Sequence, residues 1–251
     1  MYGICKVAAA PVRKEANHRS EMINQLLFGE ALELLEQKTE WCRVRSLYDG
    51  YEGWLTNHLF KVEDLLSAIT FDYVAADLMN TIQLNGQTFY IPQGASLPGF
   101  DSNSKRLWNT EYLYKGSYRN IAEQNESTIK ETAKAWVEAP YLWGGKTMMG
   151  VDCSGFVQIV FKMAGINLLR DAWQQAKQGT DVPSLEESKE NDLAFFANEE
   201  GKIIHVGILL NYKQIIHASG KVRIDAIDDD GIINSDTNER THRLHSMKRY
   251  F

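Results

Sequence analysis

The sequence predicts two small all-β barrels followed by an α+β domain. In the first half of the chain, short runs that alternate with a period of two are separated by turn residues, a spacing typical of small barrels. In the second half, helical periodicity comes first and apolar strand-like runs follow, an order typical of an α+β domain. We therefore expect domains at residues 1–66, 67–124 and 125–251.

The first domain is predicted from four short runs. Residues 5–8 indicate a strand before a polar loop at 14–20, residues 31–36 fit a strand or a helix, and residues 41–45 alternate with a period of two. The turn Asp49-Gly50 and the aromatic run after it are a strong β-hairpin signal. We expect this hairpin to organise the first barrel.

The second domain is predicted from weaker signals. Residues 82–84 and 88–91 are strand-like, residues 92–99 form a Gly- and Pro-containing loop, and no flexible linker separates this segment from the first. We expect a second, degenerate barrel.

The third domain begins with two predicted helices. The first starts near Thr128 and ends before Pro140, and the second opens at Asp152-Cys153, presents an apolar stripe and stops at Gly165. Three apolar strands follow at residues 193–196, 203–210 and 214–219.

Charge and composition exclude several classes of protein. The chain has a net charge of −6 and no lysine or arginine cluster longer than a pair, which argues against nucleic acid or an anionic membrane as its main partner. No apolar run approaches the ~20 residues of a membrane span. The N-terminal residues do not resemble a signal peptide, so we expect a cytoplasmic protein, or a periplasmic or secreted one if a leader was removed.

The three cysteines form neither a CxxC pair nor an even set, so neither a zinc site nor a disulfide framework is expected. Cys5 and Cys42 lie in apolar settings and are predicted to be inert core thiols. Cys153 is predicted in the first turn of a helix, where unpaired backbone N–H groups and the helix dipole favour a thiolate. Taken alone, this position fits a catalytic thiol and a structural one equally well.

Two histidines supply the candidate partners of Cys153. His205 and His217 interrupt apolar strands, where an imidazole needs a hydrogen-bonding partner or a task. If Tyr212 centres a three-residue turn, Gly207 faces His217, and the two imidazoles share one face within hydrogen-bonding range. A two-residue loop would put them on opposite faces. The alternative is two core histidines with structural partners only.

The third domain resembles the NlpC-type cysteine peptidase family. The matching strings are Pro140-Tyr141-Leu142-Trp143-Gly144-Gly145, Asp152-Cys153-Ser154-Gly155-Phe156-Val157, His205-Val206-Gly207-Ile208 and Ile216-His217-Ala218. The resemblance implies a circularly rearranged papain-like fold in which Cys153 is the nucleophile, His205 the general base and His217 the residue that orients His205. It implies that Tyr141 lines the site and assists oxyanion binding, that Asp152 and Ser154 contact the substrate, and that no metal or organic cofactor is needed.

Three other residues near these strings are assigned structural roles. The string 191–196 resembles a strand of the same family, and within it we expect Asp192 to cap a turn. His242 and His245, three residues apart near the C-terminus, are expected to be surface residues and not metal ligands.

The first domain resembles a bacterial SH3-type barrel through the string Tyr48-Asp49-Gly50-Tyr51-Glu52-Gly53-Trp54-Leu55. Such barrels ahead of an NlpC-type domain resemble the subgroup that recycles free murein peptides. That subgroup accepts an unblocked N-terminal L-alanine, cuts the bond between γ-D-glutamate and the diamino acid, and releases L-Ala-γ-D-Glu. In it the first barrel closes one end of the active-site cleft.

Two residues are candidates for recognising the free ammonium group. Glu21 lies in the stretch 20–30, which resembles that subgroup, and its carboxylate suits an α-ammonium group. Tyr51 could add a hydroxyl. The alternatives are a solvated surface acid and an aromatic residue that packs in the barrel.

Other functions on the same domains stay open. They are a hydrolase of intact peptidoglycan, a peptidoglycan-binding module with a decayed catalytic domain, and an acyltransferase or amidase on the same scaffold. The partner is expected to be a murein-derived peptide that carries diaminopimelate or lysine, and a monomer is favoured.

Overall fold

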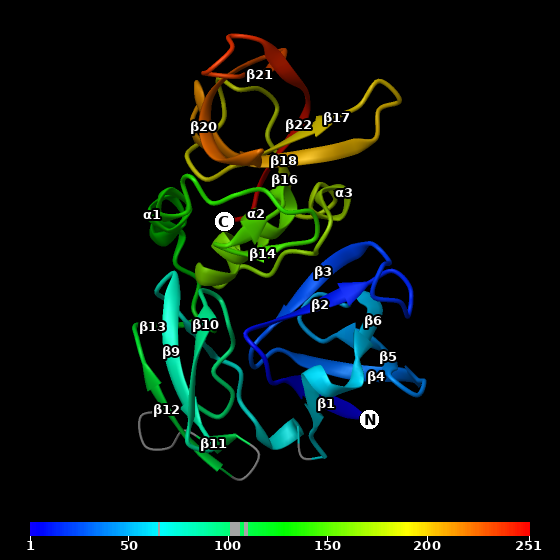
Figure 1. Ribbon diagram of the computed structural model, residues 1–251. Helices are drawn as coiled ribbons and strands as arrows, with labels where there is room; N and C mark the ends of the chain where they lie inside the picture. Colours follow the sequence, from blue (N-terminus) through cyan, green and yellow to red (C-terminus); the bar gives the residue numbers. More distant parts are fainter. Residues whose placement is uncertain (65, 101–105, 108–109) are drawn as a thin grey trace. The chain divides into compact units, whose positions relative to one another are not determined.

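The structure, a computed structural model, describes residues 1–64, 66–100, 106–107 and 110–251. The chain divides into two compact units (Figure 1). The first holds Met1–Glu123 together with Trp143–Met148, and the second holds Gln124–Leu142 and Met149–Phe251. A short segment near the middle of the chain thus belongs to the N-terminal unit, which the sequence did not predict.

A seven-stranded antiparallel sheet forms the beginning of the first unit. Its strands pair in the order β3-β2-β6-β5-β4-β1-β7. They are β1 (Tyr2–Cys5), β2 (Ala9–Arg13), β3 (Met22–Leu27), β4 (Ala31–Gln37), β5 (Trp41–Ser46), β6 (Glu52–Thr56) and β7 (Phe60–Val62), with the 3₁₀ turn Asn57–Leu59 before β7.

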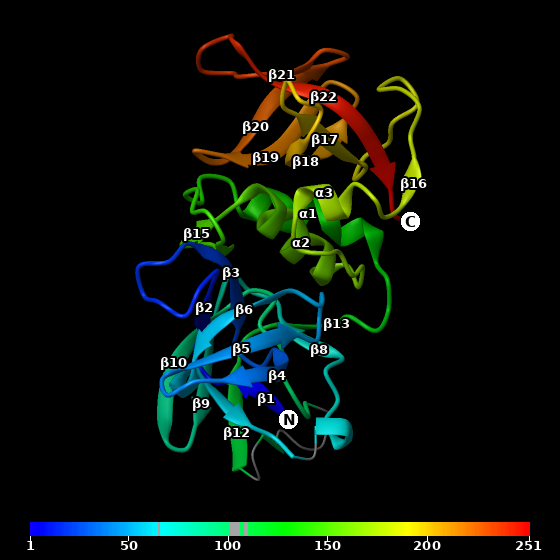
Figure 2. The same ribbon diagram turned by 90° about the vertical axis from the view of Figure 1, so that its right-hand side faces the viewer.

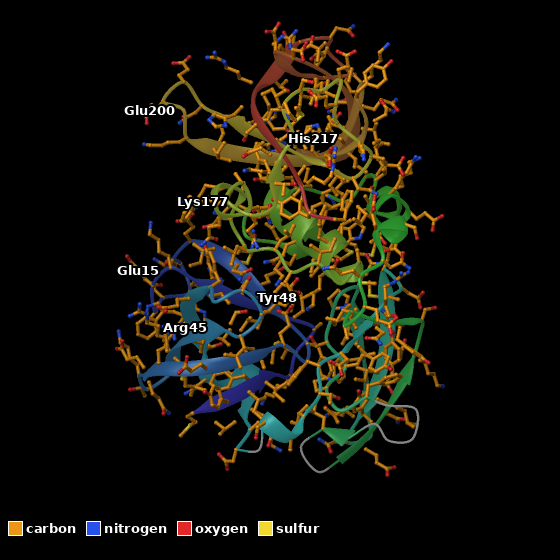
Figure 3. The ribbon with its side chains drawn as sticks, turned by 180° about the vertical axis from the view of Figure 1, so that it is seen from behind. Glu15, Arg45, Tyr48, Lys177, Glu200 and His217 are labelled. Carbon is orange, nitrogen blue, oxygen red and sulfur yellow. The ribbon has the colours of Figure 1, made fainter. Side chains whose placement is uncertain are left out.

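The predicted hairpin is confirmed. Arg45 pairs with Glu52 across β5 and β6, and Gly50 closes the turn with a φ of +72°, a conformation that glycine adopts without steric cost. Arg45, labelled in Figure 3, also forms ion pairs with Glu33 and Glu52. Residues 31–36 form a strand.

The strand predicted at residues 5–8 is wrong. β1 ends at Cys5 and β2 starts at Ala9, because these two strands have different neighbours: β1 lies between β4 and β7, and β2 between β3 and β6. The chain must bend between them. Cys5 and Cys42 are buried members of the core of this sheet, as predicted, and burial raises the pKa of the Cys5 thiol to about 12.

The rest of the first unit contains two smaller sheets. Four strands pair in the order β10-β9-β12-β11, and β13 pairs with β8. The strands are β8 (Tyr73–Ala75), β9 (Met79–Leu84), β10 (Gln87–Pro92), β11 (Arg106–Leu107), β12 (Thr110–Lys115) and β13 (Tyr118–Asn120), and a 3₁₀ turn spans Leu66–Ala68. The predicted strands at 82–84 and 88–91 are confirmed, whereas a second closed barrel stays a prediction.

The second unit follows the predicted α+β order, with helices first and strands afterwards. Its helices are α1 (Ile129–Ala135), which follows the 3₁₀ turn Glu126–Thr128, α2 (Cys153–Met163) and α3 (Ala172–Gln175). Its strands are β15 (Gly150–Val151), β16 (Thr180–Asp181), β17 (Leu193–Ala197), β18 (Ile203–Asn211), β19 (Gln214–Ser219), β20 (Lys221–Asp228), β21 (Gly231–Ile233) and β22 (Arg240–Arg249). The strand β14 (Lys146–Thr147) belongs to the first unit.

Six strands of the second unit close into a barrel. They pair in the order β22-β17-β18-β19-β20-β21, and β21 pairs back with β22. The helices lie on one side of these strands in both views (Figures 1 and 2). A buried apolar cluster that includes Phe196, Leu209, Ile215 and Ile227 fills the strands' inner face.

Both predicted helices are present, with local reasons for their ends. α1 ends well before Pro140, because the chain turns tightly after Trp136 and Glu138 takes a positive φ of +73°. α2 ends at Met163, and two residues later the N–H groups of Gly165 and Ile166 bond to carbonyls of the last helical turn in a Schellman arrangement. In the described part of the chain, no helix is long and apolar enough to cross a membrane.

The hairpin between β18 and β19 reaches the expected register by an unexpected route. Its turn has two residues between Asn211 and Gln214, where the sequence predicted three centred on Tyr212. A β-bulge between Leu209 and Asn211 supplies the missing shift, so that Gly207 still faces His217. A two-residue turn therefore does not put the two histidines on opposite faces.

The segment Trp143–Met148 is anchored in the first unit by buried polar contacts. The ammonium group of Lys146 lies 3.4 Å from a carboxylate oxygen of Glu30, and both side chains are 2% exposed. The backbone N–H of Lys146 donates to the side chain of Gln25 at 2.8 Å. Gly144 has a φ of +76°, and a Cβ atom there would lie 2.5 Å from the carbonyl oxygen of Met22.

We predict that Lys146→Met destabilises the protein by about 3–5 kcal/mol, because it removes the ammonium group that faces a buried carboxylate. The free energy of unfolding in urea measures this change. Lys14→Met is the control: Lys14 pairs with Glu21 at 3.7 Å on the surface, and such exposed pairs contribute at most about 1 kcal/mol. Equal effects of the two substitutions would contradict the assigned role of the buried pair.

Candidate active site

Cys153 is the first residue of α2, as the sequence predicted. The side chain of Asp152 caps this helix by accepting a hydrogen bond of 2.6 Å from the backbone N–H of Gly155. Cys153 itself is only 5% exposed. The cap orients the helix start, and with it the thiol and the neighbouring N–H groups.

A buried arginine holds the residues on both sides of Cys153. Arg170 donates from its two terminal nitrogens to the two oxygens of Asp152, at 3.0 and 2.6 Å, and to the hydroxyl of Ser154 at 2.9 Å. Asp152 and Ser154 are themselves buried. These two predicted substrate contacts are therefore fixed by a charge-assisted network within the unit.

His205 on β18 and His217 on β19 meet as predicted. Nε2 of His205 and Nδ1 of His217 are 2.8 Å apart, and both rings are buried. The two residues share the strand face of Leu209 and Ile215, because side chains alternate along a strand and Gly207 pairs with His217. Figure 3 labels His217.

A carboxylate extends this pair. Oδ2 of Asp225, on β20, lies 3.0 Å from Nε2 of His217. Arg223 and Ser235 hold the same carboxylate, which is 2% exposed. Burial alone would raise the pKa of Asp225, but the hydrogen bonds from His217, Ser235 and Arg223 hold it well below its usual range, so this carboxylate is ionised.

Cys153 lies in a helix that packs against the strands of the two histidines. α2 packs against β18 and β19, and the backbone of Val206, the residue after His205, lowers the pKa of the Cys153 thiol. The direct contact between Cys153 and His205 stays a prediction.

The surroundings of Cys153 do not favour the expected thiolate. Burial, followed by the charge of Asp152, raises the pKa of the Cys153 thiol to about 12, and the backbone of Val206, the charge of Arg170 and the backbone of Ser154 offset this only in part. Burial and the neighbouring imidazoles also lower the pKa of His205 well below its usual value. The helix N-terminus was located correctly, but desolvation outweighs its dipole, so both groups are neutral.

Tyr141 lies within the electrostatic reach of Cys153. Burial is the main reason why its pKa is raised, and the charges of Cys153 and Asp152 raise it further, while Arg170 lowers it. Its backbone N–H donates to the carbonyl oxygen of Gly220 at 3.0 Å. A phenol held in this way stays protonated and can donate a hydrogen bond.

The assignment of His242 as a surface residue is wrong. Its ring stacks on that of His205, with centroids 4.1 Å apart and an interplanar angle of 26°. β22 closes the barrel beside β21, and this closure brings a residue near the C-terminus against the histidine pair. His245 is exposed, as expected.

The two residues predicted to recognise an ammonium group lie in the first unit. Oε1 of Glu21 accepts a hydrogen bond of 2.8 Å from Nε1 of Trp143, and the other oxygen faces Lys14 at 3.7 Å. Glu21 is exposed, and Tyr51, the residue before β6, is half-buried. The contact with Trp143 orients the carboxylate of Glu21 but leaves it accessible to solvent.

Asp192 caps a turn, as predicted, and has a second role. Its carboxylate accepts from the backbone N–H of Lys189 at 2.7 Å and forms a two-point ion pair with Arg249. The pair fastens the start of β17 to the end of β22.

Sequence reasoning missed Arg170 and Asp225. Arg170 is a single charged residue after two leucines, and nothing in its spacing distinguishes it from a surface arginine. Residues 222–225 do alternate between apolar and charged types, which indicates a strand. That pattern would have placed the charged face toward solvent, whereas barrel closure buries it.

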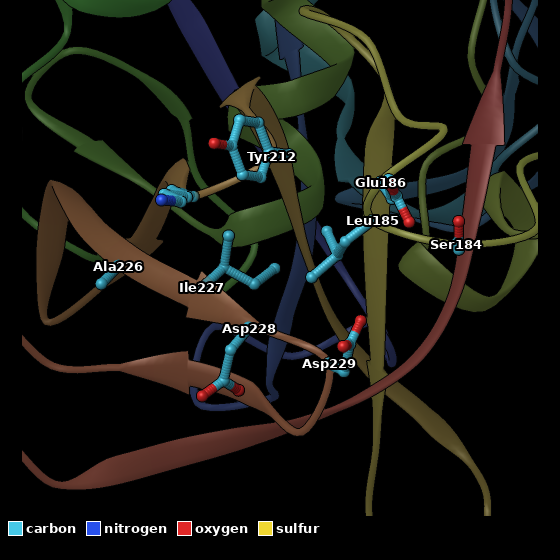
Figure 4. Close-up of a pocket in the computed structure, with 9 residues that line it drawn as sticks. Ser184, Leu185, Glu186, Tyr212, Ala226, Ile227, Asp228 and Asp229 are labelled. Carbon is cyan, nitrogen blue, oxygen red and sulfur yellow. The ribbon is translucent and has the colours of Figure 1, made fainter.

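A separate hollow on the second unit lacks these groups. It has a volume of about 730 Å³ and is lined by residues of β20, the turn between β18 and β19 and the loop before β17, among them Leu185, Tyr212, Ile227 and Asp228 (Figure 4). None of the predicted site residues lines it. Among the described residues, no group of three or more His, Cys, Asp or Glu side chains is arranged to hold a metal ion.

We predict a fall in stability at acid pH that depends on His242. Burial is the main reason why the pKa of His242 is lowered to about 4 from 6.5. Between these two values the unfolded chain binds more protons than the folded one, so the free energy of unfolding falls as the pH falls. We expect the free energy of unfolding to fall by about 1–3 kcal/mol. The fall should be nearer the lower figure, because the ring of His242 keeps some contact with water.

The measurement is denaturant unfolding at several pH values from about 7 down to about 4.5. His242→Phe keeps a ring against His205 but cannot titrate, so its stability should depend less steeply on pH. Asp225 contributes its own loss only below its ordinary value of 3.8, outside this window. Identical slopes for the two proteins would show that His242 does not titrate as inferred.

Two known domain families match the sequence. A profile of the NlpC/P60 family matches residues 138–241, and a profile of the bacterial dipeptidyl-peptidase Sh3 domain matches residues 12–58. The first match contains Cys153, His205 and His217, and the second contains the Asp49-Gly50 hairpin. Both predicted resemblances are confirmed.

Individual proteins are similar over most of the chain. The chain is 32% identical over 213 residues to a gamma-D-glutamyl-L-lysine dipeptidyl-peptidase of Bacillus subtilis (strain 168). The aligned region covers 77% of this chain and 71% of that protein. The chain is 24% identical over 263 residues to dipeptidyl-peptidase 6 of Lysinibacillus sphaericus, 91% of this chain and 93% of that one.

A solved structure shares the fold. The crystal structure of an NlpC/P60 family protein from Bacillus cereus ATCC 10987 superposes with a TM-score of 0.81 at 20% identity, and the match covers 100% of this chain and 99% of that one. Together with the sequence matches, this shows that the chain belongs to the NlpC/P60 family of cysteine peptidases.

Proposed function

We propose that the chain hydrolyses the bond between γ-D-glutamate and the diamino acid of free murein peptides with an unblocked N-terminal L-alanine, and releases L-Ala-γ-D-Glu. The observation that carries the proposal is the hydrogen bond between His205 and His217, on two strands that pack against the helix that begins with Cys153. The printed names of the relatives, a gamma-D-glutamyl-L-lysine dipeptidyl-peptidase and dipeptidyl-peptidase 6, support the substrate class.

In the proposed mechanism, Nδ1 of His205 faces the sulfur of Cys153 and removes the thiol proton as the sulfur attacks the γ-carbonyl carbon. Because thiol and imidazole are both neutral at rest, proton transfer accompanies attack and does not precede it. His217 orients His205 and shares the positive charge that develops on it. This arrangement is the one expected of a circularly rearranged papain-like domain.

The tetrahedral intermediate carries a negative oxygen that needs donors. The backbone N–H of Cys153 at the start of α2 supplies one, and the protonated hydroxyl of Tyr141 supplies the other. The C–N bond then breaks, and His205 gives its proton to the departing amine of the diamino acid. Water, activated by His205, hydrolyses the thioester that remains on Cys153.

Substrate recognition is assigned to two groups of residues. Asp152 and Ser154, held by Arg170, contact the substrate next to the nucleophile, where the network keeps their polar atoms in fixed positions. Glu21 and Tyr51 recognise the free α-ammonium group of L-alanine. The accessible carboxylate of Glu21, oriented by Trp143, supports this role.

We predict that Cys153→Ala abolishes hydrolysis of L-Ala-γ-D-Glu-diaminopimelate while the protein still unfolds cooperatively. Mass spectrometry of the products measures the activity. Cys42→Ala is the control, because Cys42 lies in the core of the first sheet and has no catalytic role. A fully active Cys153→Ala protein would rule out Cys153 as the nucleophile, whereas an unmodified protein that leaves the peptide intact would favour a binding module.

We predict that the N-acetylated peptide is cleaved about 5- to 150-fold less efficiently in kcat/KM, because acetylation removes a charge-assisted hydrogen bond of about 1–3 kcal/mol. Intact sacculi should be poor substrates for the same reason. Glu21→Gln should reduce the difference in kcat/KM between the free and the N-acetylated peptide. The glutamine can still accept from Trp143, so the anchor of the loop is kept.

Glu15→Gln is the matched control for Glu21→Gln, since Glu15 is an exposed acid in the same loop between β2 and β3 (Figure 3). Glu15→Gln should leave the difference in kcat/KM between the free and the acetylated peptide unchanged. Equal cleavage of free and acetylated peptides by the unmodified protein would favour a hydrolase of intact peptidoglycan instead. A difference that persists in Glu21→Gln would assign ammonium recognition to another residue.

A further inference from the structure

We propose that Asp225 is a positioning residue that fixes the proton positions on both catalytic histidines, so that Nδ1 of His205 carries the lone pair that accepts the thiol proton. The inference rests on the proposed cysteine-peptidase chemistry. It concerns a residue on a different strand from either histidine, outside the set of three implied by the family resemblance.

Both oxygens of Asp225 are contacted by N–H or O–H donors. Oδ1 accepts from the backbone N–H and the hydroxyl of Ser235, at 3.0 and 2.8 Å, and from Arg223 at 3.0 Å. Oδ2 faces Nε of Arg223 at 2.8 Å and Nε2 of His217 at 3.0 Å. A carboxylate held by these donors is an acceptor only, so Nε2 of His217 must carry a proton.

The proton on Nε2 of His217 determines where His205 carries its own proton. A neutral imidazole has one protonated nitrogen, so a proton on Nε2 of His217 leaves Nδ1 as an acceptor. Nδ1 of His217 lies 2.8 Å from Nε2 of His205, which must therefore donate. The other nitrogen of His205, Nδ1, is then unprotonated and available as a base.

The environment limits the alternatives. The stacked ring of His242 and the tilted ring of Phe196 contact His205, and Asp225, Arg223 and Asp236 supply the nearby charges. Asp225 is ionised and 2% exposed, so it cannot turn to water to satisfy its oxygens. Among the residues that the structure describes, His217 is the one whose ring hydrogen-bonds this carboxylate and can move its proton between two nitrogens.

Asp225→Asn tests the proposal because it keeps the shape and changes one acceptor into a donor. The backbone N–H of Ser235 cannot move and requires the amide oxygen on its side, so the amide NH₂ faces Nε2 of His217. His217 must then move its proton to Nδ1, and His205 must move its own to the nitrogen that serves as the base. We expect kcat to fall about 10²- to 10⁴-fold, the usual contribution of a general base, with little change in KM.

Nitrogen-15 NMR of the histidine side chains in the full-length protein provides a readout that a merely structural role would not change. At neutral pH, the unmodified protein should show His217 with its proton on Nε2, and Asp225→Asn should show it on Nδ1. Asp228→Asn is the matched control: Asp228 is on the same strand and pairs with Arg240, not with a histidine. Asp228→Asn should leave kcat and the nitrogen-15 signals of His205 and His217 unchanged.

Three results would overturn the proposal. The first is a spectrum of the unmodified protein in which His217 carries its proton on Nδ1 or on both nitrogens. The second is an Asp225→Asn variant with unchanged kcat. The third is an Asp225→Asn variant that loses activity while the proton of His217 stays on Nε2. The spectrum of the unmodified protein needs no substrate and no variant. It therefore decides the matter even if Asp225→Asn fails to fold, and it is independent of whether the proposed peptide is the substrate.

Discussion

The hydrogen bond between His205 and His217 depends on the register of one hairpin. Side chains on neighbouring strands meet only when the pairing places them on the same face, and a shift of one residue would separate them. The bulge between Leu209 and Asn211 restores the register that a two-residue turn would otherwise lose. Gly207 is part of the same constraint, because a Cβ atom there would lie 2.8 Å from Cβ of His217.

Closure of the barrel then determines the environment of this pair. β20 brings Asp225 to the far side of His217, and β22 brings His242 onto the face of His205. Both additions bury the imidazoles, which lowers the pKa of His205, and the same dry surroundings raise the pKa of Cys153. These pKa shifts favour a neutral thiol and a neutral imidazole, and the ionised carboxylate of Asp225 is positioned to stabilise the imidazolium of the proposed mechanism.

The first unit contributes in a way that its sequence motif did not reveal. Three polar residues of the stretch 20–30, namely Glu21, Gln25 and Glu30, each contact the segment Trp143–Met148. In the chain this segment lies between Tyr141 and Asp152, two of the proposed site residues. A resemblance that pointed to substrate recognition therefore also marks the residues that hold a loop in place.

The sequence by itself determined the features that depend on local pattern. Alternation and turn residues predicted β5, β6, β17, β18 and β19, an N-cap and an apolar stripe predicted α2, and the strings around Cys153, His205 and His217 indicated the family. Only the tertiary structure decided which charged groups are buried and what they contact. Arg170 and Asp225 look like surface residues in the sequence, because their partners lie on other elements and their burial depends on how the helices pack and how the barrel closes. The same reason explains the thiol, since a helix dipole acts locally, whereas desolvation depends on everything that surrounds the group.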